Sequence, residues 1–328
     1  MKPTQVRSIQ KVLHYIFLSG VIFLGILSII GTGGDGGGST PQITYTGLTT
    51  QAEITDANAE LFAAGAFGAG RTGTTFSDMG TVEKSSNVNI SGFTAFSISQ
   101  TLKNAVFQID LSSITSPPFI GATQSGTDEG PCGGTASYSM QVNETTGVFS
   151  GTFTFKSYCD SDVVITGKTT VSGTINLVTM NIEDIQFHFE SLSDGNSTLR
   201  GDLDMDFTVD PIRAEFDTYL KDNATGTVYW ASNYVMNITD TGYYVDVEII
   251  SGDYYEPDYG YVTVETPEPF RVAYAEIWPL SGIMIATGTG NTKLRLTAIS
   301  NTQCQIDADL DGDDTYEWGP VTKNWEDL

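Results

Sequence analysis

Basic residues, histidine and cysteine are all scarce in this chain of 328 residues. Fifteen lysines and arginines stand against forty aspartates and glutamates, which gives a formal net charge of −25. A surface of this charge repels phosphate-bearing polymers, so the composition argues against nucleic acid as a partner. Self-repulsion also disfavours the compact state unless salt or divalent cations screen it, and this favours a salty or calcium-containing exterior.

Histidine catalysis and nucleotide chemistry have little support in the sequence. Only two histidines are present, and His188 alternates with Phe187 and Phe189, which predicts that it faces the polar side of a strand. The sequence contains no nucleophile elbow, no phosphate loop and no histidine-rich metal motif. Because acidic residues are so many, a carboxylate-dependent hydrolase stays open as an alternative, but the sequence favours a protein that is not an enzyme.

The amino-terminal segment 1–30 is predicted to be a signal peptide or a membrane anchor. Lysine and arginine precede an uncharged, mostly apolar run over residues 12–30. At ~1.5 Å per residue this run reaches ~28 Å, close to the thickness of the hydrocarbon layer, so a cleaved signal and a retained anchor fit it equally well. The flanking cations predict that the rest of the chain is exported. The glycine-rich stretch 31–41 is then a flexible tether.

Most of the remaining chain alternates between apolar and polar residues, as strands do when they bury one face. Turn signals such as SDGN and TDTG separate these runs. The predicted β domain, residues 131–328, is therefore an antiparallel meander of about a dozen strands that curls into a barrel or a sandwich. The residues predicted on its apolar faces are Val171, Ile175, Leu177, Ile185, Phe187, Phe189, Leu199, Leu203, Met205, Phe207, Val209, Trp230, Tyr234, Met236, Ile238, Tyr243, Val245, Val247, Ile249, Phe270, Val272, Tyr274, Leu294 and Leu296.

Residues 42–120 do not follow this pattern and are predicted to form a short helical block. Thr55 or Asp56 can cap a first helix in TDANAELFAAG. A second helix is predicted in SISQTLKNAVFQIDL. Its apolar residues at helical spacing are Ile98, Leu102, Ala105, Val106 and Ile109. The segment 116–131 is predicted to be a long loop before the sheet.

Three cysteines in an exported chain predict one disulfide and one remaining thiol. The runs GTASYSMQVN and VFSGTFTFKS flank the turn ETTG, and pairing them about this turn places Tyr138 opposite Phe153. The same register brings Cys132 opposite Cys159, at a non-hydrogen-bonded position that suits a disulfide. Two buried thiols in a reducing compartment are the alternative. Cys304 is predicted to face the core as a buried thiol.

The segment DADLDGDDTYEW is a candidate calcium site. Its alternate carboxylates and its glycine match the first half of an EF-hand-type loop, but a tryptophan stands where that loop has a bidentate glutamate. A calcium site and a solvated acidic turn are both compatible with this pattern. The turn is predicted to centre on Gly312, with Ile306 opposite Trp318. The candidate metal ligands are Asp307, Asp309, Asp311, Asp313 and Glu317.

Six tyrosines lie between residues 243 and 261, and four of them stand in or beside the segment SGDYYEPDYGY. Aromatic rings near carboxylates are typical of surfaces that stack on sugars or anchor a partner protein. The alternative is that the rings fasten a long hairpin loop to the sheet. The candidate ligand-binding residues are Tyr254, Tyr255, Tyr259 and Tyr261. They predict a protein that binds a glycan, the matrix or another envelope component.

The carboxy-terminal stretch SGIMIATGTGNTKLRLTAISNTQCQIDADLDGDDTYEWGPVTKNWEDL resembles the ending of a group of exported, lipoprotein-like bacterial proteins of no established activity. An RLTA strand, a DxDGDGTYE loop and a terminal WxxL recur in that group. The stretch PQITYTGLTTQAEITDANAELFAAGAFG is similar to their amino-terminal block. The resemblance implies a secreted or surface β-rich protein of the bacterial cell envelope and no catalytic residues. The chain departs from the lipoprotein pattern because no cysteine lies between Ile30 and Gly38, where lipid would attach.

Overall fold

The computed structural model describes residues 43–75, 95–108, 123–179, 181–274 and 276–328, and the structural statements below refer to these ranges. Residues 44–328 belong to one compact unit, so the helical block and the sheet share it. Within the described ranges, no helix is both long enough and apolar enough to span a bilayer. The predicted signal or anchor, the tether and Ile109 lie outside the described residues.

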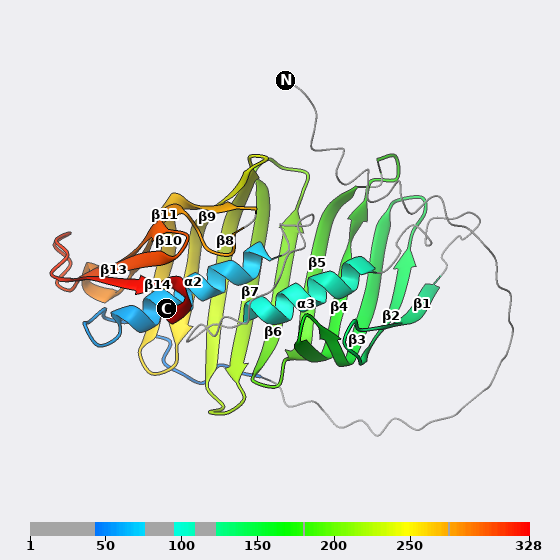
Figure 1. Ribbon diagram of the computed structural model, residues 1–328, viewed down its shortest axis with the longest axis horizontal. Helices are drawn as coiled ribbons and strands as arrows, with labels where there is room; N and C mark the ends of the chain where they lie inside the picture. Colours follow the sequence, from blue (N-terminus) through cyan, green and yellow to red (C-terminus); the bar gives the residue numbers. More distant parts are fainter. Residues whose placement is uncertain (1–42, 76–94, 109–122, 180, 275) are drawn as a thin grey trace, which may run out of the picture. The chain divides into compact units, whose positions relative to one another are not determined.

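Fourteen strands form a single sheet in which each strand pairs antiparallel with its sequence neighbours (Figure 1). The predicted antiparallel meander is confirmed. The sheet is open, since β1 and β14 are its two edges. The strands are β1 (Thr123–Glu129), β2 (Thr135–Val142), β3 (Val148–Asp160), β4 (Val163–Ile175), β5 (Ile182–Ser193), β6 (Ser197–Asp206), β7 (Ile212–Asp222), β8 (Val228–Asp240), β9 (Tyr244–Glu256), β10 (Gly260–Ala273), β11 (Ser281–Thr287), β12 (Lys293–Ser300), β13 (Gln303–Asp309) and β14 (Trp318–Asn324).

Two helices, α2 (Ala59–Thr74) and α3 (Ala95–Gln108), cover one face of this sheet, as Figure 1 shows. Helix α2 contacts strands from β7 to β13, and α3 contacts β3, β4 and β6. The apolar sides of the strands meet the helices in one core of buried residues. Burial of each large apolar side chain contributes roughly 1.5–3 kcal/mol, so sheet and helices stabilise each other. Two short 3₁₀ turns, η2 (Thr289–Asn291) and η3 (Trp325–Asp327), complete the described elements.

The helix predictions are confirmed for position and wrong for the cap. The predicted apolar residues of α3 within the described range are all buried. Helix α2 begins after Asn58 instead of Thr55 or Asp56. The reason is a turn before the helix, in which the Asn58 side chain accepts a hydrogen bond from the backbone N–H of Thr55 over 2.8 Å. The residues that resemble a cap therefore form this turn.

Strand β1 lies inside the segment 116–131 that the sequence predicts to be a loop, so that prediction is wrong for residues 123–129. The strand has no apolar alternation because neither of its faces is buried. Its backbone pairing with β2, which runs from Thr123 opposite Gln141 to Glu129 opposite Thr135, holds it in the sheet. Hydrophobic patterning cannot detect an edge strand of this kind.

The hairpin of β2 and β3 has the predicted register, with Tyr138 opposite Phe153. The disulfide between Cys132 and Cys159 is confirmed, and the two Cα atoms lie 5.1 Å apart. The predicted non-hydrogen-bonded position is wrong, because the backbone N–H of Cys132 donates to the carbonyl of Cys159 over 3.3 Å. The cysteines lie beyond the last regular pair of the ladder, where Ser157 has a φ of 50° and breaks the regular pairing.

Most of the predicted apolar residues are buried, and the exceptions lie at strand ends or at a bulge. Leu177, Val209 and Tyr243 are exposed because each lies just beyond the end of its strand. The predicted burial of Cys304 is confirmed, since this β13 residue is fully buried and burial raises the pKa of its thiol to about 11. Trp230 does not face the core.

Glycine allows α2 to lie directly on the sheet. A Cβ atom at Gly65 would overlap the phenol ring and hydroxyl of Tyr254, a fully buried side chain of β9. A Cβ atom at Gly70 would lie 2.9 Å from Cδ1 of Ile249, and this atom is the end of a flexible side chain. The two positions differ in whether the neighbouring atoms can move away.

Gly65→Ala is expected to destabilise the protein by about 1–3 kcal/mol, because the added methyl group overpacks the contact with Tyr254. Gly70→Ala is the matched control. Its contact can relax, and alanine favours a helix over glycine by about 1 kcal/mol, so its stability should change little. Urea unfolding of both variants measures the difference. Equal losses at the two positions would contradict the proposed contact.

Candidate functional site

A row of aromatic side chains lies on the sheet face that points away from the helices. Tyr219 of β7 is directly opposite Trp230 of β8, Trp230 is opposite Tyr255 of β9, and Tyr255 is opposite Tyr261 of β10. Tyr45, which precedes α2 in the chain, packs against Trp230 and Tyr255. We call these five residues the aromatic stripe. Each is partly exposed.

The rings of the stripe are packed on one another. Neighbouring ring centroids along the row are 5.4, 4.3 and 5.0 Å apart, and the interplanar angles are 16°, 24° and 32°. The ring of Tyr45 lies 5.9 Å from that of Trp230 and 5.6 Å from that of Tyr255. Because the rings share faces with each other, the row offers a ligand its edges, its hydroxyl groups and the faces at its ends.

Two aspartates border the stripe and are held in place by hydrogen bonds. Asp217 accepts hydrogen bonds from the indole N–H of Trp230 over 2.8 Å and from the hydroxyl of Ser232 over 3.1 Å. Asp253 accepts a hydrogen bond from the hydroxyl of Thr263 over 3.1 Å. Partial burial raises the pKa of Asp253, and the bond from Thr263 lowers it in part. Both carboxylates retain lone pairs for hydroxyl or ammonium donors.

Burial and nearby carboxylates raise the pKa of three stripe tyrosines, Tyr45, Tyr219 and Tyr255. Burial raises the pKa of Tyr45, and the carboxylates of Glu256 and Asp258 raise it further. Burial also raises the pKa of Tyr255, with additional contributions from Asp253 and Asp217. A neutral phenol can both donate and accept a hydrogen bond. The stripe is therefore a polar and aromatic surface bordered by negative charge.

The four tyrosines predicted as ligand-binding residues do not lie on one surface. Tyr255 and Tyr261 belong to the stripe. Tyr254 is fully buried on the helix side of the sheet, where its ring packs edge-on against Phe62. Tyr259 lies in the turn between β9 and β10, 6.1 Å from the ring of Phe62. Successive residues of a strand point to opposite faces, so adjacent tyrosines cannot all contact one ligand.

No pattern in the sequence indicates Tyr45, Tyr219 or Trp230 as binding residues, and alternation predicts Trp230 on the core face. That placement is wrong because of Asn233, which has a φ of 52° and lies at a break in the pairing of β8 with β9. The extra residue of this bulge reverses the alternation, so that Tyr234 points into the core while Trp230 points outward. An asparagine before Tyr234 was the only signal in the sequence, because asparagine tolerates a positive φ.

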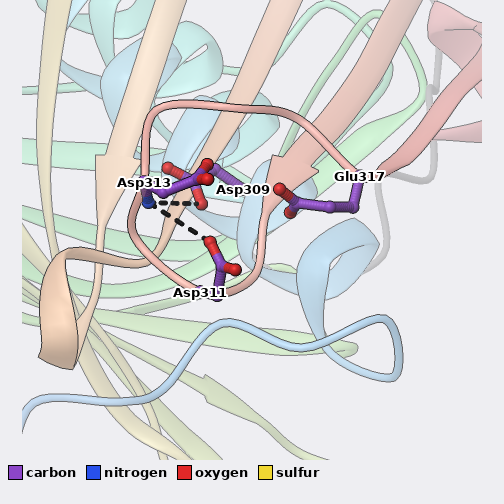
Figure 2. A group of neighbouring side chains, drawn as sticks. All are labelled: Asp309, Asp311, Asp313 and Glu317. Atoms are coloured by element: carbon purple, nitrogen blue, oxygen red, sulfur yellow. Dashed lines mark hydrogen bonds between the residues drawn. The ribbon is translucent and has the colours of Figure 1, made fainter.

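A second candidate site is the loop between β13 and β14. It brings together Asp309, Asp311, Asp313 and Glu317, and one carboxylate oxygen from each lies within 4.8 Å of the others (Figure 2). We call these four residues the acidic cluster. Such a group could hold a metal ion, since carboxylate oxygens are the ligands of hard cations.

Asp307, the fifth predicted metal ligand, does not join the acidic cluster. Its two carboxylate oxygens accept hydrogen bonds from Nε and Nη2 of Arg295 over 2.9 and 2.5 Å, in a two-point ion pair across β12 and β13. The guanidinium of Arg295 also lies 4.1 Å from the centre of the Tyr316 ring. Asp307 thus has a structural role in β13, where it joins this strand to β12 through Arg295.

Asp309 organises the loop through backbone groups. It is fully buried, and its carboxylate accepts hydrogen bonds from the N–H groups of Gly312 and Asp314 over 2.7 and 2.8 Å. A third bond comes from the N–H of Asp313 over 3.3 Å. The Glu317 carboxylate accepts a bond from the N–H of Leu310 over 3.0 Å. The carboxylates therefore lie close together because the backbone holds them.

The hairpin of β13 and β14 does not have the predicted register. Ala308 pairs with Trp318, whereas Ile306 pairs with Val321, and a shift separates the two pairs. Gly319, at a φ of 92°, lies within the shifted part of β14. The predicted register, centred on Gly312, assumed a regular ladder. The shift in pairing instead lies in β14, the strand after the loop. The acidic loop consequently spans residues 310–317, longer than the loop 310–314 predicted from a regular ladder.

The four acidic residues that are buried in the described chain, Asp160, Glu256, Asp307 and Asp309, each accept hydrogen bonds. Asp160 accepts a hydrogen bond from the side-chain amide of Asn104 over 2.6 Å, and Glu256 accepts one from the backbone N–H of Asp258 over 2.8 Å. Asp307 and Asp309 are engaged as described above. No observation on these residues favours the hydrolase alternative.

Searches with the whole chain match no family model, no curated protein and no solved structure. The function is therefore inferred from the aromatic stripe and the acidic cluster.

Asp309→Ala is expected to destabilise the protein by about 1–3 kcal/mol, because three backbone N–H groups lose a buried acceptor. Asp311→Ala, in the same loop, is the control. Asp311 is exposed and its pKa is raised by desolvation and by the charges of Asp313 and Glu317, so its removal relieves repulsion and should cost little. Urea unfolding without added divalent cations measures both. A larger loss at Asp311 would refute the role given to Asp309.

Proposed function

We propose that the protein is a non-enzymatic, exported binding protein of the bacterial cell envelope that holds a glycan on the aromatic stripe. The observation that carries the proposal is the direct cross-strand alignment of Tyr219, Trp230, Tyr255 and Tyr261 on the sheet face away from the helices. Tyrosine and tryptophan are the residues that dominate binding surfaces, because they offer a large area and few rotatable bonds.

The dimensions and polar groups of the stripe support a glycan as the ligand. Four neighbouring strands at ~4.8 Å spacing give a row ~14 Å long, which can accommodate a short oligosaccharide. The ring edges and end faces supply apolar contacts for the C–H groups of a sugar. The tyrosine hydroxyls, together with Asp217 and Asp253, supply donors and acceptors for sugar hydroxyls. An export signal or anchor in residues 1–30, as predicted from the sequence, would bring this surface into contact with envelope glycans.

The double variant Tyr255→Ala/Tyr261→Ala is expected to weaken glycan binding at least tenfold, which corresponds to about 1.4 kcal/mol. It removes two adjacent rings at the centre and end of the row. Tyr243→Ala is the matched control, because Tyr243 is 80% exposed and lies outside the stripe. A glycan array identifies the ligand, and titration calorimetry compares the variants after melting curves confirm that they fold. Unchanged affinity in the double variant would refute the proposal.

We further propose that the acidic cluster binds calcium and stabilises the end of the sheet. Four carboxylate groups with oxygens within 4.8 Å of one another offer the hard oxygen ligands that calcium prefers. Desolvation and the neighbouring charges of Asp313 and Glu317 raise the pKa of Asp311, and a cation would offset this repulsion. Lys293 pairs with Asp314 beside the cluster, and none of the four cluster carboxylates forms an ion pair in the described chain.

Calcium at ten times its dissociation constant is expected to stabilise the protein by about 1.4 kcal/mol. Melting curves with millimolar calcium, with magnesium and with a chelator measure the effect, and calcium should raise the melting temperature most. In the variant Asp311→Asn/Asp313→Asn the calcium effect should disappear. Asp56→Asn/Asp162→Asn removes the same charge from two exposed sites elsewhere and serves as control. A melting temperature that does not respond to calcium would rule out this site.

A further inference from the structure

The charge that surrounds the aromatic stripe distinguishes between classes of glycan. Asp217 and Asp253 lie on the same outward face as the stripe, and Asp258 lies in the turn beside it. Two basic residues also lie on this face: Arg200 of β6, which is opposite Tyr219, and Lys221 of β7, which is two residues beyond Tyr219. Sugars that carry carboxylates would meet repulsion here, and sugars that carry ammonium groups would be attracted.

The negative surface continues from the stripe across β5, β6 and β7. Three pairs of acidic residues lie directly opposite each other on adjacent strands of the outward face. Like charges in this position destabilise a sheet, so these pairs are a cost in the free protein. Of the basic residues near these pairs, Arg213 pairs with Glu215 and Lys168 pairs with Glu190. The pairs are Asp184 with Asp206, Asp202 with Asp217, and Asp204 with Glu215.

The ring faces at the two ends of the stripe also favour positive charge. The face of an aromatic ring carries negative electrostatic potential and attracts ammonium groups, whereas the faces of Trp230 are stacked against Tyr219 and Tyr255. Trp230 lies in the middle of the stripe, and its indole is oriented by Asp217. Asp217 also belongs to the acidic surface, because it is opposite Asp202. The rings and the carboxylates therefore form one continuous surface on which acidic residues outnumber the basic residues Arg200 and Lys221.

From this complementarity we infer that the glycan held by the stripe is an amino-sugar polymer with free amino groups. The inference rests on the proposed glycan function and specifies its ligand class. The sugar rings would lie along the aromatic row, and their ammonium groups would lie beside Asp217 and Asp253. Acetylation removes the positive charge and keeps the shape of the sugar, so it isolates the electrostatic contribution. Uronic acids reverse the charge.

Titration calorimetry with three hexasaccharides tests the inference: the hexamer of glucosamine, the hexamer of N-acetylglucosamine and the hexamer of galacturonic acid. We expect the glucosamine hexamer to bind at least tenfold more tightly than the acetylated hexamer at low ionic strength. The galacturonic acid hexamer should bind most weakly. Raising the salt concentration should narrow the difference, because the charges are partly exposed.

The protein should bind the glucosamine hexamer more tightly than the N-acetylglucosamine hexamer, and the variant Asp217→Asn/Asp253→Asn is expected to reduce the ratio of these two affinities at least fivefold. Asparagine retains an oxygen that can accept the hydrogen bond from Trp230, so the stripe should stay in place. Asp56→Asn/Asp162→Asn changes the net charge equally at exposed sites outside the stripe and should leave the ratio unchanged.

The outcomes separate the inference from the proposed function. Equal affinity for the free and acetylated hexamers, or tightest binding of the uronic acid, would overturn the amino-sugar inference and leave a glycan-binding stripe. If no hexamer and no glycan on the array binds, both are overturned. Binding of a lysine-rich peptide to the stripe, in the absence of any glycan, would also overturn both and identify a basic protein segment as the occupant.

Discussion

Gly65 of α2 lies against the buried ring of Tyr254, and this close approach determines how the helix covers the sheet. A strand can bury one set of alternate side chains only if another element covers that face. With α2 and α3 on one side, the residues of opposite parity point away from the helices. Tyr254 and Tyr255 show the consequence, since one is fully buried and its neighbour belongs to the aromatic stripe. The candidate binding surface therefore depends on the core that forms behind it.

Alternation predicted the fold well wherever the strands are regular. The register of β2 and β3, the disulfide between Cys132 and Cys159 and the buried side of most later strands all follow from a period of two. Prediction failed where one residue breaks that period. Asn233 reverses the faces of β8 and so turns Trp230 outward, and Gly319 lies within the shifted part of β14 that alters the pairing of the last hairpin. A bulge leaves almost no trace in hydrophobicity, because it depends on backbone conformation.

The candidate sites were predictable to the extent that their residues are close in sequence. Four of the five predicted metal ligands meet in the acidic cluster, since a single loop carries them. The fifth, Asp307, is taken by Arg295, a partner on another strand that no local pattern indicates. The stripe assembles from four strands and the segment before α2, and only the tyrosine-rich hairpin gave a local signal. The other residues of the stripe come together only through the pairing of strands, which no local pattern in the sequence indicates.

Acidic charge would link the stability of the protein to the proposed ligands. Opposed pairs such as Asp202 and Asp217 destabilise the sheet in the absence of cations, and so does the crowding around Asp311. A cationic ligand that binds only the folded state offsets this repulsion and stabilises the fold by mass action. The same repulsion that weakens the protein without ligand would therefore add to the affinity for the proposed cations, at the acidic cluster as at the stripe. A chain of net charge −25 would accordingly be most stable where calcium or amine-bearing polymers surround it.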